Sequence, residues 1–218
     1  MATLLITLSP PILIVYFFVR SDKFEEPVFL ILKSFFAGIL LCFPAGSLNY
    51  YLIWSSSDPY FFSFLAGIIE ETLKFLVLLL YIKPKENFNE PYDAIVYGTS
   101  ISLGFATLEN LEYVYASYLA DPLIISIIRA FSAIPMHACC GIIMGFYFGL
   151  FVFRGERIQV LKALLIPVSL HAIYNFSTNL GILFIFVLAF MIFMSYSLFF
   201  KVKREQQEKN KEIENKIF

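Results

Sequence analysis

The chain has 218 residues, of which 59% are hydrophobic and only 15% are charged, and its net charge is −1. A soluble domain of this length carries far more charge, so the composition excludes a large soluble module. No basic patch with interleaved aromatic residues appears, and we expect no nucleic-acid partner. Because the apolar residues come in long blocks, we expect an all-α, polytopic membrane helix bundle.

Seven apolar segments are long enough to cross a lipid bilayer. Their approximate limits are residues 3–19, 28–54, 60–82, 94–119, 122–153, 160–179 and 181–200. The first segment has no basic region before it and contains Pro10-Pro11, so we expect a mature helix rather than a signal peptide. We expect a single transmembrane domain over residues 1–200, followed by a charged, solvated cytoplasmic tail over residues 201–218.

The basic residues of the loops predict the orientation. Lys and Arg follow the first, third, fifth and seventh predicted spans, whereas the loops after the second, fourth and sixth carry none. Cytoplasmic loops of membrane proteins carry the excess of Lys and Arg. This alternation predicts an N-terminus outside and a C-terminus in the cytoplasm, and it favours seven spans over six or eight.

The third predicted span carries three charged residues near its middle, Glu70, Glu71 and Lys74. A charged side chain at the centre of a membrane helix costs about 2.5–3.5 kcal/mol on insertion scales. Lys74 follows Glu70 by four residues and Glu71 by three, so on a helix it can pair with either. A structural ion pair explains one glutamate and leaves the other without a partner, which indicates a functional role.

Three later spans add further polar residues. The fourth span contains Glu109, the fifth contains Arg129 and His137, and the sixth contains His171 and Asn175 on one helix face. The two histidines are the only ones in the chain. A lone membrane histidine is often only a hydrogen-bonding residue between helices. Here both histidines of the chain lie within predicted spans, together with these carboxylates, and this favours a functional site.

Two features of the fifth span predict how it packs. Pro135 removes a backbone hydrogen bond just before His137, as at sites where a helix opens onto a cavity. Gly141, Gly145 and Gly149 follow at steps of four, which is typical of close packing between membrane helices.

The depths of the polar residues are consistent with one site. At 1.5 Å per residue, Glu70 and His171 lie roughly 15 Å from the interface where their spans begin. Glu109 and His137 lie roughly 20 Å along theirs. Because successive spans run in opposite directions, the four residues can meet between the midplane and the outer half of the membrane.

Such a group of residues permits two hydrolytic designs. In the first, two histidines and a glutamate bind Zn²⁺ with an open position for water, and another glutamate is the general base. In the second no metal binds: a buried glutamate activates water, while His and Asn side chains stabilise the oxyanion. Non-enzymatic alternatives are a scaffold held together by polar contacts and a proton or cation transporter.

The polar residues belong to motifs that occur in a definite order. The motifs read Glu70-Glu71-x-x-Lys74, Tyr92-Asp93-Ala94-Ile95-Val96-Tyr97-Gly98, Gly104-Phe105-x-x-x-Glu109-Asn110, Pro135-x-His137-Ala138 and His171-x-x-Tyr174-Asn175. Together they resemble the PrsW family of intramembrane proteases, which is related to the CAAX-protease and bacteriocin-processing superfamily. The resemblance covers about half of the chain.

The resemblance implies an intramembrane metalloendopeptidase in the plasma membrane of a prokaryote, with a catalytic core at about residues 60–179. Glu70 and Glu71 match its paired glutamates; Glu70 is the preferred general base, and Glu71 is its partner or the base itself. His137, His171 and Glu109 are the expected Zn²⁺ ligands.

The resemblance also implies supporting residues and a substrate. Asn175 would orient His171 or donate to the oxyanion. From the sequence itself, we expect Lys74 to pair with Glu71, and Arg129 to form a structural ion pair or to neutralise a glutamate or the substrate. Two departures from the wider superfamily matter: Glu109 stands where a histidine is usual, and Lys74 stands near the place of an arginine. The implied substrate is a membrane-anchored protein, such as an anti-sigma-factor-like regulator.

Overall fold

The computed structural model describes residues 1–116 and 121–217, with side chains up to residue 211. The end of the fourth predicted span, residues 117–119, lies outside the described residues, as do the side chains at the end of the tail. All regular structure in the described part is helical, as predicted. The helices are α1 (Ala2–Ser21), α2 (Val28–Asn49), α3 (Phe64–Val77), α4 (Pro91–Ala116), α5 (Pro122–Phe131), α6 (Ala133–Arg154), α7 (Ile158–Thr178) and α8 (Leu183–Ile217).

Short helical segments extend two of these helices. α2 continues as a π-helical segment, η1 (Tyr50–Trp54), and α3 continues as another, η3 (Leu78–Ile82). A single 3₁₀ turn, η2 (Phe61–Ser63), leads into α3. With these extensions, and with α5 and α6 taken together, the described residues form one helical rod for each of the seven predicted spans.

Five of the rods are long and apolar enough to cross a membrane. They are Ala2–Ser21, Val28–Trp54, Pro122–Arg154, Ile158–Thr178 and Leu183–Lys211. The other two rods contain α3 and α4, which carry the glutamates and the lysine of the predicted site. Large apolar side chains such as Phe36, Leu165 and Phe193 are exposed on the outer helices, as expected for a surface that faces lipid.

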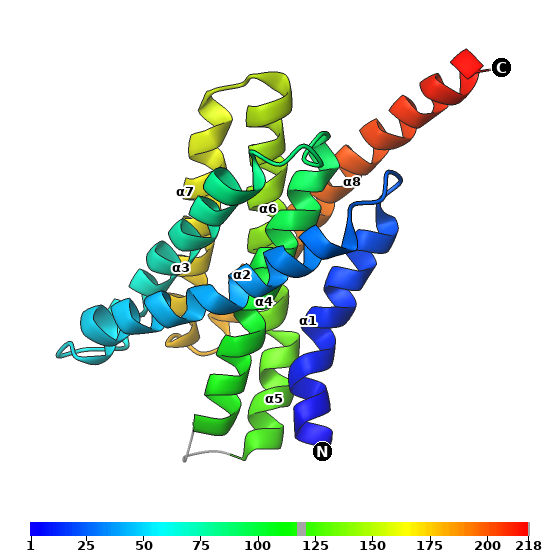
Figure 1. The fold of residues 1–218 in the computed structure, drawn as a ribbon. Coiled ribbons are helices and arrows are strands. Elements are labelled where there is room, and N and C mark those ends of the chain that lie inside the picture. Colours follow the sequence, from blue (N-terminus) through cyan, green and yellow to red (C-terminus); the bar gives the residue numbers. More distant parts are fainter. Residues whose placement is uncertain (117–120, 218) are drawn as a thin grey trace.

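α4 is the central helix and packs against α1, α2 and α6 (Figure 1). Its residues from Tyr92 to Thr107 are buried on all sides. A helix can be surrounded in this way only if its neighbours approach closely, and small residues permit that approach. A Cβ atom on Gly145 of α6 would lie only 2.3 Å from the Ala94 carbonyl oxygen of α4. The prediction that this glycine and its neighbours in α6 serve close packing is confirmed.

The predicted interruption of the fifth span lies at Ser132, not directly before His137. Ser132 separates α5 from α6 and has non-helical dihedral angles, φ −126° and ψ −74°. Pro135 is the third residue of α6, where a missing N–H costs no helical hydrogen bond. The break lies upstream of the proline because the proline ring clashes with the backbone of the preceding turn.

The tail is a continuation of α8. α8 runs without interruption to Ile217, and its last turns project beyond the bundle (Figure 1). Val202 and Gln206 are nevertheless buried, and Gln206 donates a hydrogen bond to Asp22 in the α1–α2 loop at 2.7 Å. The expectation of a solvated tail is therefore wrong for its first two turns. They pack against the bundle, where the Gln206 amide donates a hydrogen bond to the Asp22 carboxylate.

Candidate active site

A cavity of about 340 Å³ lies among α3, α4, α6 and α7. Its volume falls in the range of small-molecule and cofactor pockets, about 300–1,000 Å³. Its polar lining includes Asn49, Glu70, Glu109, Arg129, His137, His171 and Asn175. The structure thus places most of the residues expected to form the site around one space.

Glu71 and Lys74 lie behind the cavity wall. Neither lines the cavity, and both are almost completely buried. Lys74 Nζ lies 2.7 Å from Glu71 Oε1 and 3.9 Å from Glu70 Oε2. A helix spacing of three and four residues places both carboxylates beside one ammonium group, as the sequence predicts. The structure therefore separates the two glutamates: Glu71 forms the close ion pair, and Glu70 faces the cavity.

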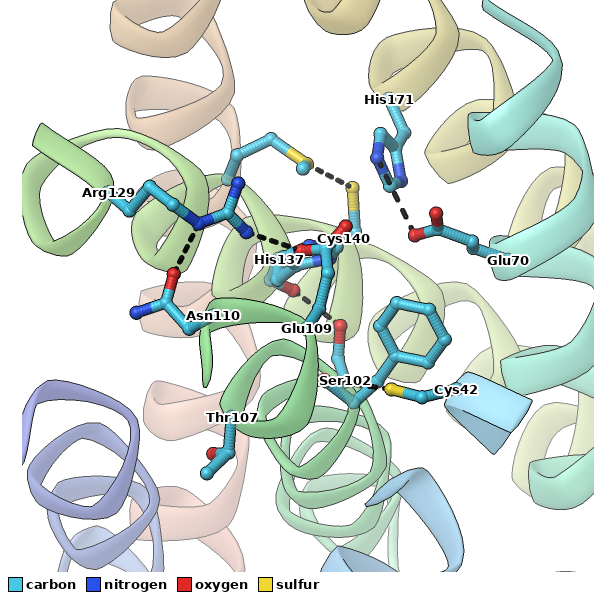
Figure 2. Close-up of polar contacts among 12 residues, drawn as sticks. Cys42, Glu70, Ser102, Thr107, Glu109, Asn110, Arg129, His137, Cys140 and His171 are labelled. Atoms are coloured by element: carbon cyan, nitrogen blue, oxygen red, sulfur yellow. Dashed lines mark hydrogen bonds and ion pairs between the residues drawn. The ribbon is translucent and has the colours of Figure 1, made fainter. Parts of the chain in front are cut away.

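His171 is oriented by Glu71. Its Nδ1 lies 2.9 Å from Glu71 Oε1, and its Nε2 lies 3.9 Å from Glu70 Oε2. A carboxylate that accepts the Nδ1 proton leaves the lone pair on Nε2, on the side of the ring toward Glu70. Figure 2 shows the His171 ring and the Glu70 carboxylate facing each other across the site.

His137 joins the second half of the site. Its Nδ1 lies 3.0 Å from Lys74 Nζ, and its Nε2 lies 3.0 Å from Glu109 Oε2. Glu109 also accepts a hydrogen bond from Arg129 Nη2 at 2.6 Å, and Arg129 donates through Nε to Asn110 (Figure 2). α4, α5 and α6 are thus connected through one chain of polar contacts.

Three side chains can approach a common metal ion. Glu70, His137 and His171 are all buried, and each offers a ligand atom within 4.8 Å of the other two. Glu70 Oε2 is buried and has no hydrogen-bond partner among the described residues. Two imidazoles and a carboxylate are ligands that zinc accepts at catalytic sites. The donor set and the unpartnered oxygen therefore fit a metal ion.

The charges of the site also favour a bound cation. Glu70, Glu71 and Glu109 face only two basic side chains, Lys74 and Arg129, within ion-pair distance in the described structure. If the histidines are neutral, one buried carboxylate is not balanced. Buried charges are normally paired or bound to a metal, so a cation would complete the site.

Two details differ from the expected arrangement. Asn175 lines the cavity, but it contacts the Ser63 carbonyl at 3.5 Å, and the described partner of His171 Nδ1 is Glu71. Asn49 of α2, which is not among the residues predicted from the sequence, donates to Glu70 Oε1 at 3.1 Å. The available signal was an amide side chain near the end of a largely apolar span.

The remaining residues of the predicted site are Glu109 and Arg129. Glu109 and Arg129 form an ion pair at the cavity wall. Glu109 is outside the group of three that can share a metal ion, and its role as a ligand stays a prediction.

The fold and the cavity together define a class of protein. It is a multi-pass helical membrane protein in which buried histidines and carboxylates, contributed by separate helices, surround a space inside the bundle. Side chains of this kind are expensive within a membrane and mark functional sites there.

Comparison with known proteins identifies the family. The model of the PrsW family of intramembrane metalloproteases matches residues 26–199. Protease PrsW of Bacillus subtilis (strain 168) is 38% identical over 189 residues, which cover 84% of this chain and 85% of that protein. Protease PrsW of Geobacillus kaustophilus (strain HTA426) is 37% identical over 168 residues, 75% of this chain and 73% of that protein. Protease PrsW of Oceanobacillus iheyensis is 31% identical over 206 residues, 92% of this chain and 94% of that protein.

The chain belongs to the PrsW family of intramembrane metalloproteases. It is therefore a hydrolase and a multi-pass membrane protein with bacterial relatives. The resemblance predicted from the motifs is confirmed, and the scaffold and transporter alternatives are set aside. No solved structure matches the chain.

Proposed function

We propose that the chain hydrolyses a peptide bond of a membrane-anchored protein substrate within the cavity, with Glu70, His137 and His171 as the ligands of a catalytic Zn²⁺ ion. The observation that carries this proposal is the convergence of these three buried side chains beside the cavity. The orientation of His171 by Glu71 supports it, because metal-binding histidines usually donate their other ring N–H to a carboxylate. When bound, zinc would polarise the scissile carbonyl and lower the pKa of a water molecule to about 7.

Glu109 is the carboxylate left to transfer protons. It lines the same cavity, and its contact with Arg129 fixes its position. In this proposal Glu109 accepts a proton from the attacking water and returns it to the leaving amine. Asn175, whose contact with Ser63 is long, donates a hydrogen bond to the developing oxyanion. In this assignment Glu70 is a zinc ligand and Glu109 is the general base, which is the reverse of the roles predicted from the sequence.

A second, metal-free design is favoured by one observation. Both ring nitrogens of His137 have protein partners, Lys74 and Glu109, each at 3.0 Å. In this design Glu70 itself takes the proton from water, and His137 and Asn175 stabilise the oxyanion.

Metal content and cleavage, measured together, test these proposals. We expect about one equivalent of zinc in the purified, detergent-solubilised protein, as at a mononuclear catalytic site. Zinc should fall in His137→Ala, His171→Ala and Glu70→Gln, whereas Glu109→Gln should keep its zinc and lose cleavage of a membrane-anchored test substrate. Zinc loss in Glu109→Gln with retention in Glu70→Gln would mean that Glu109 is the zinc ligand and Glu70 the general base, as predicted from the sequence. Cleavage by a metal-free preparation would overturn the zinc assignment and support the second design.

We also propose a membrane location, an orientation and a substrate class for the reaction. The bacterial relatives support a plasma-membrane location. The alternation of basic loops supports an N-terminus outside and a C-terminus in the cytoplasm. The depth of the cavity residues supports a substrate anchored in the same bilayer, and a regulator of the anti-sigma-factor type is the class that the family resemblance implies.

A further inference from the structure

A second group of buried acidic residues lies far from the cavity, where the α1–α2 loop, the start of α4 and α8 meet. Asp22 and Glu26 belong to the loop, and Asp93 lies in the first turn of α4. The three carboxylates are buried, and each offers an oxygen within 4.8 Å of the other two. Asp93 precedes Glu109 by sixteen residues on α4, which is about 24 Å along a helix, so the group is separate from the proposed active site.

One oxygen of each carboxylate is held by a hydrogen bond. Asp93 Oδ2 accepts from the backbone N–H groups of Asn89 and Glu90, at 2.7 and 2.8 Å. Asp22 Oδ1 accepts from the Phe24 backbone N–H at 3.1 Å and from Gln206 at 2.7 Å. The Tyr97 hydroxyl donates to Glu26 Oε2. These bonds fix the carboxylates in position without neutralising them.

The second oxygens of the two aspartates have no such partner. Asp22 Oδ2 and Asp93 Oδ1 are buried and accept no hydrogen bond from any described residue. The exposed fraction is 8% for Asp22 and 0% for Asp93. An unpartnered buried oxygen is costly, and two of them within one acidic group indicate a missing ligand that accepts electron pairs.

No basic side chain in the described part of the chain forms an ion pair with these three carboxylates. Lys209 instead pairs with the neighbouring Glu90 at 3.6 Å, and Lys203 donates to Gln206 at 3.1 Å. Burial raises the pKa of the Asp22 and Glu26 carboxyls. A bound cation would offset the cost of burying three carboxylates that have no basic partner at ion-pair distance among the described residues.

We propose that Asp22, Glu26 and Asp93 form a binding site for a hard divalent cation, Mg²⁺ or Ca²⁺. Both ions prefer carboxylate oxygens, and neither needs the nitrogen ligands of the active site. The bound ion would link the α1–α2 loop directly to the central helix α4. Through Gln206, which contacts Asp22, it would also fix the first turns of the tail against the bundle.

Cation-dependent thermal stability tests the proposal. The full-length His171→Ala protein is the parent, so that binding at the proposed active site contributes little, and it is stripped of metal before MgCl₂ or CaCl₂ is added. A ligand that binds only the folded state raises the melting temperature, and we expect this rise in the parent. Asp22→Asn and Asp93→Asn should abolish the rise and weaken cation binding in calorimetric titration at least about tenfold, because a charged ligand is lost.

A matched control and a competing arrangement make the test decisive. Glu25→Gln changes the charge of the same loop at an exposed position, and it should keep the full response. Asparagine at position 93 can still accept both backbone hydrogen bonds, so we expect this variant to fold; if it does not, Asp22→Asn decides. No response in the parent, with higher stability of Asp93→Asn, would mean that Glu26 and Asp93 share a proton instead. An unchanged response in the aspartate variants would place the cation elsewhere. Either result would overturn the proposal.

Discussion

Lys74 shows at the level of single residues why two adjacent glutamates are compatible with a buried position. Its ammonium group contacts Glu71, approaches Glu70, touches His137 and lies 4.3 Å from the centre of the Phe105 ring. One cation therefore serves both the structural glutamate and the histidine beside the cavity. The apparent surplus of charge in the sequence is divided between a buried ion pair and a carboxylate that faces the site.

Removing Lys74 should destabilise the protein strongly. In Lys74→Met, Glu71 remains buried without its cation, and breaking a buried pair costs about 3–5 kcal/mol. Glu71→Gln/Lys74→Met should recover much of this loss, because the glutamine carbonyl can still accept the His171 Nδ1 proton. Unfolding in mixed detergent micelles, analysed as a double-mutant cycle, measures the coupling. Equal stabilities of the wild type and Lys74→Met would contradict the assigned ion pair.

At the level of elements, α6 determines the geometry of the site through two local features. Its glycine stripe brings it against the backbone of α4, which aligns His137 with Glu109. The break at Ser132 directs α5 so that Arg129 can reach Glu109. Packing and catalytic geometry therefore depend on the same stretch of the chain.

A methyl group in the α4–α6 contact should weaken the bundle. Gly145→Ala places a Cβ 2.3 Å from the Ala94 carbonyl oxygen, and overpacking of this kind costs about 1–3 kcal/mol. Gly46→Ala is the matched control, because nothing lies within 4 Å of the added Cβ and alanine favours the helix. Thermal unfolding in detergent compares the two variants. Equal stabilities would show that the helices can separate without cost.

Replacing the proline of α6 should separate stability from activity. Pro135→Ala restores an N–H that the Phe131 carbonyl can accept, so α5 and α6 can join into one continuous helix. We expect an unchanged or higher melting temperature together with lower cleavage activity, since Arg129 would rotate away from Glu109. Melting temperature and substrate cleavage are measured on the same preparation. Full activity in a stable Pro135→Ala protein would show that the break is not needed to position Arg129.

At the level of the whole molecule, the two ends of the bundle differ in chemistry. The connection from α1 to α2, the start of α4, the α6–α7 connection and the C-terminus lie at one end, and the N-terminus lies at the other (Figure 1). The end that holds the C-terminus carries the basic loops and the proposed cation site. The cavity lies inside the bundle between them.

Labelling from each side of the membrane tests the orientation. The native cysteines, Cys42, Cys139 and Cys140, are buried and should remain unlabelled. Ser57→Cys and Glu86→Cys place thiols at exposed positions in different loops. A membrane-impermeant maleimide added to intact cells should label position 57 and not position 86, and inverted membrane vesicles should give the reverse. The opposite pattern would invert the proposed topology.

Local chemistry made the helical class and the seven rods predictable. Hydropathy and segment length act residue by residue, because a bilayer demands about 20 apolar residues for each helical span. The rarity of charged side chains within such spans likewise singled out Glu70, Glu71, Glu109, His137 and His171, and their motifs indicated the family.

Only the tertiary structure decided how these residues are paired. His171 contacts Glu71 from a position 100 residues away, and nothing in the sequence could rank Glu71 above Asn175 as its partner. The choice of Glu70 as the glutamate that faces the cavity depends on the rotation of α3 against α7, and the contact from Asn49 depends on the path of α2. The sequence by itself determined which polar groups enter the membrane, because that cost is local. Helix packing determined which of them meet, because the contacts join residues that are distant in the chain.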